Sequence, residues 1–388
     1  MTLQQNKDRI QTTHIGSLPR PHTLLGVMKK KYGGESYDDD EYQRILRTSV
    51  EASVRKQAAC GIDVVTDGEF SKPGFFTYVR ERLDGFEARP GQKLVFFQKE
   101  TEAFPEYYAE YFKTAMMGGA ILSIAPVVCT GPVKYRGEAL VRIDIDNVKA
   151  AADAAGVSHD HVFLPATAPS GVGTNEYYKT EEEYFHALAA ELNHEYRAIV
   201  DSGILVQIDD PFLTDIFVEP GLDGRQRARR AEIYVEACNA GLEGIPTERV
   251  RYHTCYGINE GPRIFEPQLG EVIEHIYRIE ASVYSFEAAN PRHEHDYHVF
   301  EEHKLPEGKA IMPGVITHAS NIVEHPELIA EWLVRFAGLV GRENLIAGAD
   351  CGFSSQAMYK TEVHPTVIWA KFEAMAEGAR IASDKLWG

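Results

Sequence analysis

Eight short apolar runs, with helix-patterned stretches between them, constrain the fold of this chain most strongly. Each run is rich in valine, isoleucine or aromatic residues and ends in a polar or glycine-containing cluster. We expect strands at residues 12–17, 63–69, 162–170, 205–211, 250–256, 283–288, 310–318 and 345–351. Helical periodicity predicts helices at residues 40–61, 180–202, 225–240, 267–279 and 326–340. Because eight parallel strands joined by helices close into a barrel, the sequence predicts an α/β fold, a single (β/α)8 TIM barrel.

One connection is longer than a single helix requires. It runs from about Phe86 to Lys149 and contains a ninth apolar run at residues 120–133. We expect this segment, 86–149, to be an excursion inserted after the second strand, formed by a hairpin and helices that lean on the barrel. No linker rich in serine, glycine or proline divides the chain, so the sequence predicts one domain over residues 1–388.

The charge and the cysteine content of the chain limit which binding partners and which cellular compartment are expected. The chain has 58 acidic and 40 basic residues, a net charge of −18, which disfavours binding to nucleic acid or to an anionic membrane surface. Its start lacks a basic segment followed by an apolar one, and no stretch has the length of a membrane span, so we expect a cytoplasmic protein. Five cysteines argue against a disulfide framework and leave some thiols for a metal. The sequence is compatible with a homo-oligomer.

Polar side chains close every predicted strand. In a parallel barrel the active site lies at the carboxyl ends of the strands, and apolar strands do not need such endings for stability. This density of reactive groups favours an enzyme or a ligand-binding site. The strand-end residues are His14, Ser17, Asp67, Glu69, Thr167, Ser170, Asp209, Asp210, His253, Cys255, Glu287, His318, Asp350 and Cys351.

Four of these residues could bind one metal ion. His253 and Cys255 stand two apart in a predicted strand, so their side chains point to the same side. Glu287 closes the next strand and Cys351 closes the last one. A histidine, two thiolates and a carboxylate suit tetrahedral zinc, and sulfur disfavours magnesium or calcium. The alternative is that the cysteines are small buried apolar residues and the histidine is a hydrogen-bonded core residue; spacing alone leaves both interpretations open.

Several motifs, in one order along nearly the whole chain, extend this picture. They are THIGSLPRP, GIDVVTDGEF, LDGF, VQIDDP, HTCYG, YSFEAAN, PGVITH and GADCG. With them the chain resembles the catalytic barrel of cobalamin-independent methionine synthase. The resemblance implies that zinc is the cofactor and that its ligands are His253, Cys255, Glu287 and Cys351.

The resemblance also implies a site for homocysteine. The matching substrate residues are Ile15, Gly16, Ser17, Glu69 and Asp209. An α-ammonium group favours carboxylates, whereas an α-carboxylate favours hydroxyl and backbone donors. His318 matches the histidine thought to carry a proton to the departing pterin, a role suited to an imidazole. Asp350, next to a predicted ligand, would orient His318 or another group around the metal.

The expected function is zinc-dependent transfer of a methyl group to homocysteine, giving methionine, with the donor left open. Family members stack a pterin on a tryptophan near the third strand, but here the first tryptophan is Trp332. Tyr177 or Tyr178 could substitute for it. One alternative is a thiol addition like that of the related epoxyalkane coenzyme M transferases. Another is a barrel that binds zinc or thiols without catalysis.

Overall fold

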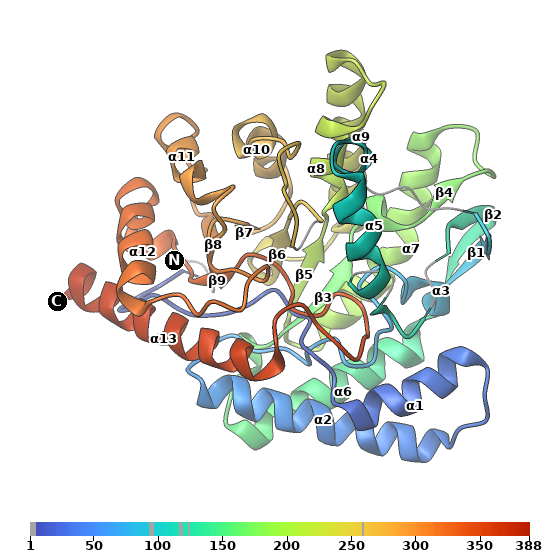
Figure 1. Cartoon of the computed structure of the whole chain (residues 1–388), viewed down its shortest axis with the longest axis horizontal. Coiled ribbons are helices and arrows are strands. Elements are labelled where there is room, and N and C mark those ends of the chain that lie inside the picture. Colours follow the sequence, from blue (N-terminus) through green and yellow to red (C-terminus); the bar gives the residue numbers. More distant parts are fainter. Residues whose placement is uncertain (1–4, 93–96, 116–118, 123–124, 258–259) are drawn as a thin grey trace.

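Six parallel strands form one curled sheet at the centre of the chain (Figure 1). The computed structural model describes residues 5–92, 97–115, 119–122, 125–257 and 260–388. The strands are buried throughout, as expected of a parallel sheet covered by helices. In sheet order they are β3 (Phe163–Thr167), β5 (Leu205–Asp209), β6 (Val250–His253), β7 (Val283–Phe286), β8 (Ala310–Ile316) and β9 (Gly348–Ala349).

The first two predicted strands contribute single bridges instead of regular strands. Thr12 pairs with Ala347, Thr13 with Val64, and Val65 with Val162, all in parallel. Shortly after these bridges the backbone leaves the extended conformation, at Gly16 (φ 138°) and at Glu69 (φ 59°). The sheet therefore contains six of the eight predicted strands, and a regular eight-stranded barrel is not confirmed.

All five predicted helices are present, with ends shifted by at most two residues. They are α2 (Asp39–Ala59), α7 (Glu181–Asp201), α9 (Gly224–Gly241), α10 (Leu269–Tyr277) and α12 (Pro326–Val340). Side-chain caps begin several of them: the side chain of Thr180 accepts from the Glu183 N–H, and Asp223 forms a capping box with Gln226. No helix within the described residues is long and apolar enough to cross a membrane.

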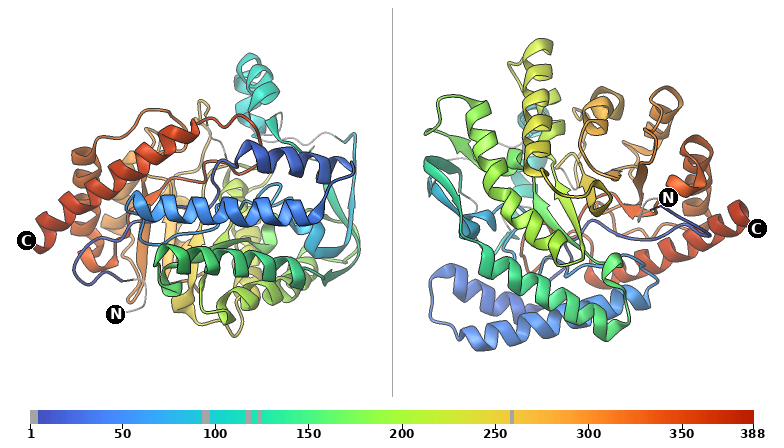
Figure 2. Two further views of the ribbon diagram at one scale, coloured as in Figure 1. Left: turned by 90° about the horizontal axis from the view of Figure 1, so that it is seen from below. Right: turned by 180° about the vertical axis from the view of Figure 1, so that it is seen from behind.

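Three further long helices were not predicted. They are α1 (His22–Gly33), α6 (Glu138–Ala155) and α13 (Pro365–Trp387). Figure 2 shows α1, α2 and α6 side by side along one flank of the molecule. Helix α6 buries Val141, Ile145, Val148 and Ala152, the spacing of one helical face. Helix α6 packs against α2 and α7 and runs from inside the predicted excursion, 86–149, to Ala155.

The excursion contains the expected antiparallel pair and two helices. Strand β1 (Leu83–Ala88) pairs with β2 (Val127–Tyr135), and β2 also pairs with the short parallel strand β4 (Thr174–Asn175). Helices α4 (Gln98–Ala103) and α5 (Pro105–Thr114) lie between β1 and β2 in the sequence. Residues 93–96, 116–118 and 123–124 of the excursion lie outside the described residues.

Hydrogen bonds attach the excursion helices to loops that follow the barrel strands. The Tyr107 hydroxyl donates to the Glu260 carbonyl at 2.8 Å, and the Phe265 N–H donates to Glu100 Oε1 at 3.0 Å. Tyr111 donates to Glu362 Oε1 at 2.5 Å. These bonds place α4 and α5 over the carboxyl ends of the strands, where the predicted site residues lie.

Candidate metal and thiol site

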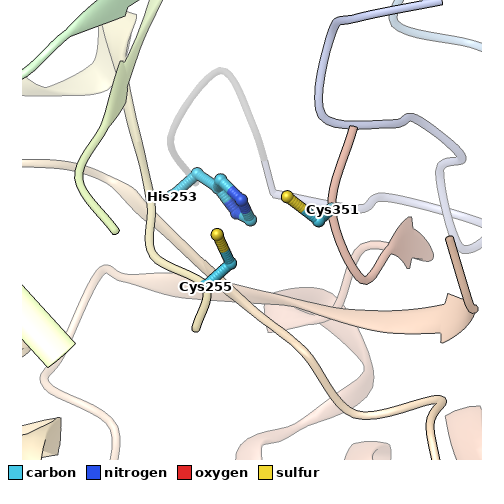
Figure 3. Close-up of side chains that lie close together, drawn as sticks. All are labelled: His253, Cys255 and Cys351. Atoms are coloured by element: carbon cyan, nitrogen blue, oxygen red, sulfur yellow. The ribbon is translucent and has the colours of Figure 1, made fainter. Parts of the chain in front are cut away.

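The structure brings three of the four predicted ligands together. His253 ends β6, Cys255 follows two residues later, and Cys351 lies two residues after β9. The ligand atoms of all three lie within 4.8 Å of one another. Figure 3 shows the two sulfur atoms and the imidazole converging on one point. A group of one imidazole and two thiols is the donor set that zinc prefers.

The surroundings of His253 favour its neutral imidazole, the form that binds a metal. Its ring is 2% exposed, and Nδ1 contacts Ser285 Oγ at 3.1 Å. Nε2 is buried and has no hydrogen-bond partner among the described residues. Burial first, and then His318 and Arg251, lower the pKa of His253 to about 3. A buried ring nitrogen without a partner is unusual in a folded protein, and a metal ion would satisfy it in the tautomer whose Nδ1–H donates to Ser285.

Cys351 affects the ionisation of Cys255. A hydrogen bond with Cys351, and next burial and the Glu287 carboxylate, raise the pKa of Cys255 well above its ordinary value. The Thr214 hydroxyl donates to the Cys255 carbonyl at 2.6 Å and so fixes the loop after β6. A divalent cation favours thiolates over thiols, so it would remove the cost of ionising this pair. The residues present therefore fit a zinc ion.

Glu287, the fourth predicted ligand, falls in a neighbouring group. Its carboxylate, a His318 ring nitrogen and an Asp350 carboxylate oxygen lie within 4.8 Å of one another, all buried. Glu287 Oε2 accepts from Arg263 Nη2 at 2.6 Å and from Asn290 Nδ2 at 2.8 Å. Arg263 was missed in the sequence because it lies in a loop, away from any strand end. Glu287 therefore forms an ion pair with Arg263 and lies beside the group formed by His253, Cys255 and Cys351.

Asp350 holds the loop that follows β7. Its Oδ1 accepts from the backbone N–H groups of Ala288 and Ala289, each at 2.8 Å, and its Oδ2 accepts from Asn290 Nδ2 at 3.1 Å. Burial first, and then Glu287, raise the pKa of Asp350. His318 is 2% exposed. The predicted catalytic roles of Asp350 and His318 stay predictions.

A cavity of about 380 Å³ opens beside the three grouped ligands. All three line it, as do four of the five predicted substrate residues, Ile15, Ser17, Glu69 and Asp209. The fifth, Gly16, supports the wall instead: a Cβ there would lie 2.5 Å from Pro165 Cγ and 3.0 Å from Glu69 Oε1. The cavity is large enough for an amino-acid thiol and a second small molecule.

Two buried carboxylates, those of Glu69 and Asp209, line the cavity. Glu69 sits at a positive φ of 59°, with its N–H donating to Asp67 Oδ1 at 2.8 Å and its carbonyl accepting from Arg20 at 2.7 Å. Glu69 Oε2 is buried without a hydrogen-bond partner among the described residues. Burial, followed by the Glu69 carboxylate, raises the pKa of Asp209 well above its ordinary value. A bound ammonium group would compensate both carboxylates.

Six phenylalanines form part of the remaining wall. The rings of Phe75 and Phe212 are stacked with centroids 6.5 Å apart at an interplanar angle of 23°. Tyr177 is 51% exposed, and the Tyr178 hydroxyl accepts from the Val133 N–H, so neither expected tyrosine lines the cavity. Phenylalanines in apolar stretches resemble core residues in the sequence, which is why they were missed. Those lining the cavity are Phe75, Phe76, Phe86, Phe97, Phe212 and Phe353.

Replacing Gly16 with alanine should destabilise the protein and weaken thiol binding. The new methyl group would clash with Pro165 at a backbone φ of 138° that favours glycine. We expect a loss of about 1–3 kcal/mol in the free energy of unfolding, measured with urea. Gly26→Ala is the matched control, since a Cβ there meets nothing within 4 Å. Equal stability of the two variants would contradict the predicted strain.

Comparison with known proteins identifies the family of this chain. The family described as "Cobalamin-independent synthase, Catalytic domain" matches residues 10–172 and 168–371. A methionine synthase of Sulfolobus acidocaldarius is 27% identical over 64% of this chain, an alignment that spans 62% of that protein. A 2-hydroxypropyl-CoM lyase of Xanthobacter autotrophicus is 22% identical over 97% of this chain and 96% of its own length.

A solved structure has a similar fold. A B12-independent methionine synthase from Shewanella sp., in complex with selenomethionine, superimposes with a TM-score of 0.72 at 19% identity, over 97% of this chain and 99% of that one. At this identity the likeness concerns the fold alone. The family match, by contrast, covers most of the sequence. The chain therefore belongs to the cobalamin-independent synthase family, matching its catalytic domain.

Proposed function

We propose that this chain is a zinc-dependent thiol methyltransferase that methylates homocysteine to give methionine. One observation carries the proposal: His253, Cys255 and Cys351 converge on a cavity that also holds the buried carboxylates of Glu69 and Asp209. The first three groups suit a metal and a thiol, and the carboxylates suit the ammonium group of an amino acid. The name of the Sulfolobus relative, a methionine synthase, supports methionine as the product.

The proposed metal is zinc, held by His253, Cys255 and Cys351. Glu287 is the fourth proposed ligand; it lies near enough to Cys255 to raise its pKa, and its ion pair with Arg263 competes with that role. While Glu287 stays paired with Arg263, the three grouped ligands leave one coordination position open toward the cavity, as in catalytic zinc sites, whereas structural sites are closed by four protein ligands. When bound, zinc would lower the pKa of a substrate thiol from about 8.5, so that the thiolate is available at neutral pH.

The other proposed roles belong to side chains around the cavity. Glu69 and Asp209 bind the ammonium group, and Ser17 with the backbone at Ile15 and Gly16 binds the carboxylate of homocysteine. Asp350 fixes the loop after β7 through three hydrogen bonds. His318 is the proposed proton carrier for donors whose leaving group departs as a basic amine.

A second candidate is thiol addition to an epoxide. The 2-hydroxypropyl-CoM lyase aligns with 97% of this chain, which favours this candidate. Glu69 and Asp209 argue for the amino-acid thiol, because coenzyme M carries a sulfonate and no ammonium group for these carboxylates to bind. A zinc or thiol store without catalysis is the third candidate.

The test is to add thiols to the zinc-loaded protein. We expect homocysteine to add one sulfur neighbour to zinc in X-ray absorption spectra, and to bind at least about tenfold more tightly than coenzyme M in calorimetry, because only homocysteine offers an ammonium group. Methionine formation from labelled donors then measures the reaction. Tighter binding of coenzyme M would favour the epoxide candidate, and no change at zinc with either thiol would favour a structural metal site.

A further inference from the structure

We propose that Gln207 is a positioning residue that fixes two parts of the homocysteine site relative to each other. Its amide group holds both the carboxylate of Asp209 and the backbone carbonyl group of Ile15, which lie far apart in the sequence. This inference rests on the proposed function, because it concerns the spacing between the groups that bind the ammonium and the carboxylate of homocysteine.

Gln207 lies inside the curled sheet, one layer below the carboxyl ends of the strands. It belongs to β5 and stands two residues before Asp209, so the two side chains point to the same side of the strand. In register it pairs with Pro165 of β3 and with Arg251 of β6. Gln207 is completely buried and is not among the residues that line the cavity. It therefore acts on a substrate only through the groups that it holds.

The amide nitrogen of Gln207 donates two hydrogen bonds. Nε2 lies 2.5 Å from the carbonyl oxygen of Ile15 and 2.8 Å from Asp209 Oδ1. An amide nitrogen carries two hydrogens, so both bonds form at the same time. The bond to Oδ1 fixes the orientation of a carboxylate that lines the cavity, and the bond to Ile15 fixes the backbone of a second cavity-lining residue. One side chain thus sets the distance between the two.

The segment at residues 15–17, which carries predicted substrate residues, is held by side chains from the barrel interior. The isolated bridges of the first predicted strand end at Thr13, two residues before this segment. Arg251 Nη2 donates to the carbonyl oxygen of His14 at 3.0 Å, and Gln207 holds the next carbonyl group along the chain. Because Gln207 and Arg251 are neighbours in register, they replace at this point the hydrogen bonds that a regular strand would make.

Stability alone does not explain a glutamine at this position. The interior of a parallel barrel is filled mainly by branched apolar side chains. Gln207 Oε1 is buried and has no hydrogen-bond partner among the described residues, and such an oxygen costs free energy. Both hydrogen bonds that the amide does make lead to residues of the proposed substrate site. The glutamine therefore serves the geometry of that site.

The first test compares Gln207→Met with the unmodified protein, both as zinc-loaded full chains. Methionine is similar in size to glutamine but donates no hydrogen bond. We expect calorimetry to show that homocysteine binds about tenfold more weakly to the variant, because two hydrogen bonds that orient its site are lost. Propane-1-thiol, which has neither an ammonium nor a carboxylate group, should bind both proteins equally. An equal loss of affinity for the two thiols, or an unchanged affinity for homocysteine, would overturn the proposal.

A double-mutant cycle with Asp209→Ala gives a second readout, which a purely structural role of Gln207 would not produce. Alanine removes the carboxylate that Gln207 orients, so only the bond to Ile15 remains to be lost. We expect Gln207→Met to weaken homocysteine binding about tenfold when Asp209 is present but only about threefold in the Asp209→Ala background. Equal factors in the two backgrounds would mean that Gln207 acts independently of Asp209, which contradicts the proposal.

Asn193→Leu is the matched control. Asn193 lies in the outer helix α7, and its Nδ2 also donates to two acceptors, the carbonyl oxygens of Gly241 at 2.9 Å and Glu243 at 3.0 Å. It is not among the residues that line the cavity. We expect this variant to bind homocysteine as tightly as the unmodified protein. A loss as large as that in Gln207→Met would show that breaking any such pair of amide bonds lowers the affinity, and it would overturn the specific role of Gln207.

Homocysteine binding to the unmodified protein separates the two possible failures. If homocysteine does not bind the zinc-loaded unmodified protein, the proposed function fails and the positioning role fails with it. If homocysteine binds the unmodified protein and binds Gln207→Met equally well, only the positioning role fails and the thiol site stands.

Discussion

Replacing Cys255 with serine is expected to remove zinc from the protein and to abolish methyl transfer. Cys255 is buried, lies with His253 and Cys351 in one group, and shares a hydrogen bond with Cys351. A serine hydroxyl is a poor ligand at neutral pH, so zinc affinity should fall by roughly a hundredfold or more. Zinc per chain, measured by atomic emission after dialysis against a chelator, tests this directly.

Two further variants distinguish the loss of a zinc ligand from a folding defect. Cys351→Ser, at a less buried position, should lose zinc in the same way. Cys60→Ala is the matched control, because Cys60 follows helix α2 and is not part of the metal group. We expect the control to keep zinc and activity. Full zinc content in both Cys255→Ser and Cys351→Ser would contradict the proposal that these cysteines bind zinc.

Replacing Asp209 with asparagine is expected to raise the KM for homocysteine strongly while leaving zinc content unchanged. The asparagine is nearly the same size but cannot offer a charge to the ammonium group. A charged hydrogen bond contributes about 1.5–3 kcal/mol, which corresponds to a roughly 10- to 150-fold weaker binding. Glu69→Gln should have a similar effect, because both carboxylates line the same cavity.

A ligand without the ammonium group provides the control for this prediction. 4-Mercaptobutanoate keeps the thiol and the carboxylate of homocysteine, so Asp209→Asn should not weaken its binding. An equal loss of affinity for both thiols would mean that Asp209 supports the structure instead of binding the ammonium group. The comparison requires only calorimetry on the zinc-loaded proteins.

Homocysteine affinity should also depend on pH through Asp209. Burial, followed by Glu69, raises the pKa of Asp209 well above its ordinary value. Below this raised pKa the carboxyl group keeps its proton and cannot pair with an ammonium group. Binding should therefore strengthen as the pH rises through that pKa, and this slope should be reduced in Asp209→Asn. A pH-independent affinity in the unmodified protein would contradict the assignment.

Local sequence patterns predicted most of the helices and the central strands. Helix α7 begins after the Thr180 cap, and α12 begins at Pro326, a residue suited to the first turn. Helix α6 was missed because it directly follows the β2 strand of the excursion, and a connection of unusual length hid its periodicity. The first two strands were expected to be regular but form only isolated bridges. The length of a strand depends on hydrogen bonds to neighbouring strands, which the local sequence does not show.

The sequence by itself predicted that His253 and Cys255 share one face of a strand, whereas in the structure β6 ends at His253 and Cys255 lies in the loop that follows. It also placed Glu287 and Cys351 at strand ends. Only the tertiary structure decided that Cys351 joins the pair, that Glu287 turns to Arg263, and that phenylalanines line the cavity. The physical reason is that strand periodicity is local, whereas a buried carboxylate pairs with whichever cation the folded chain brings within reach, and that partner carries no mark in the sequence.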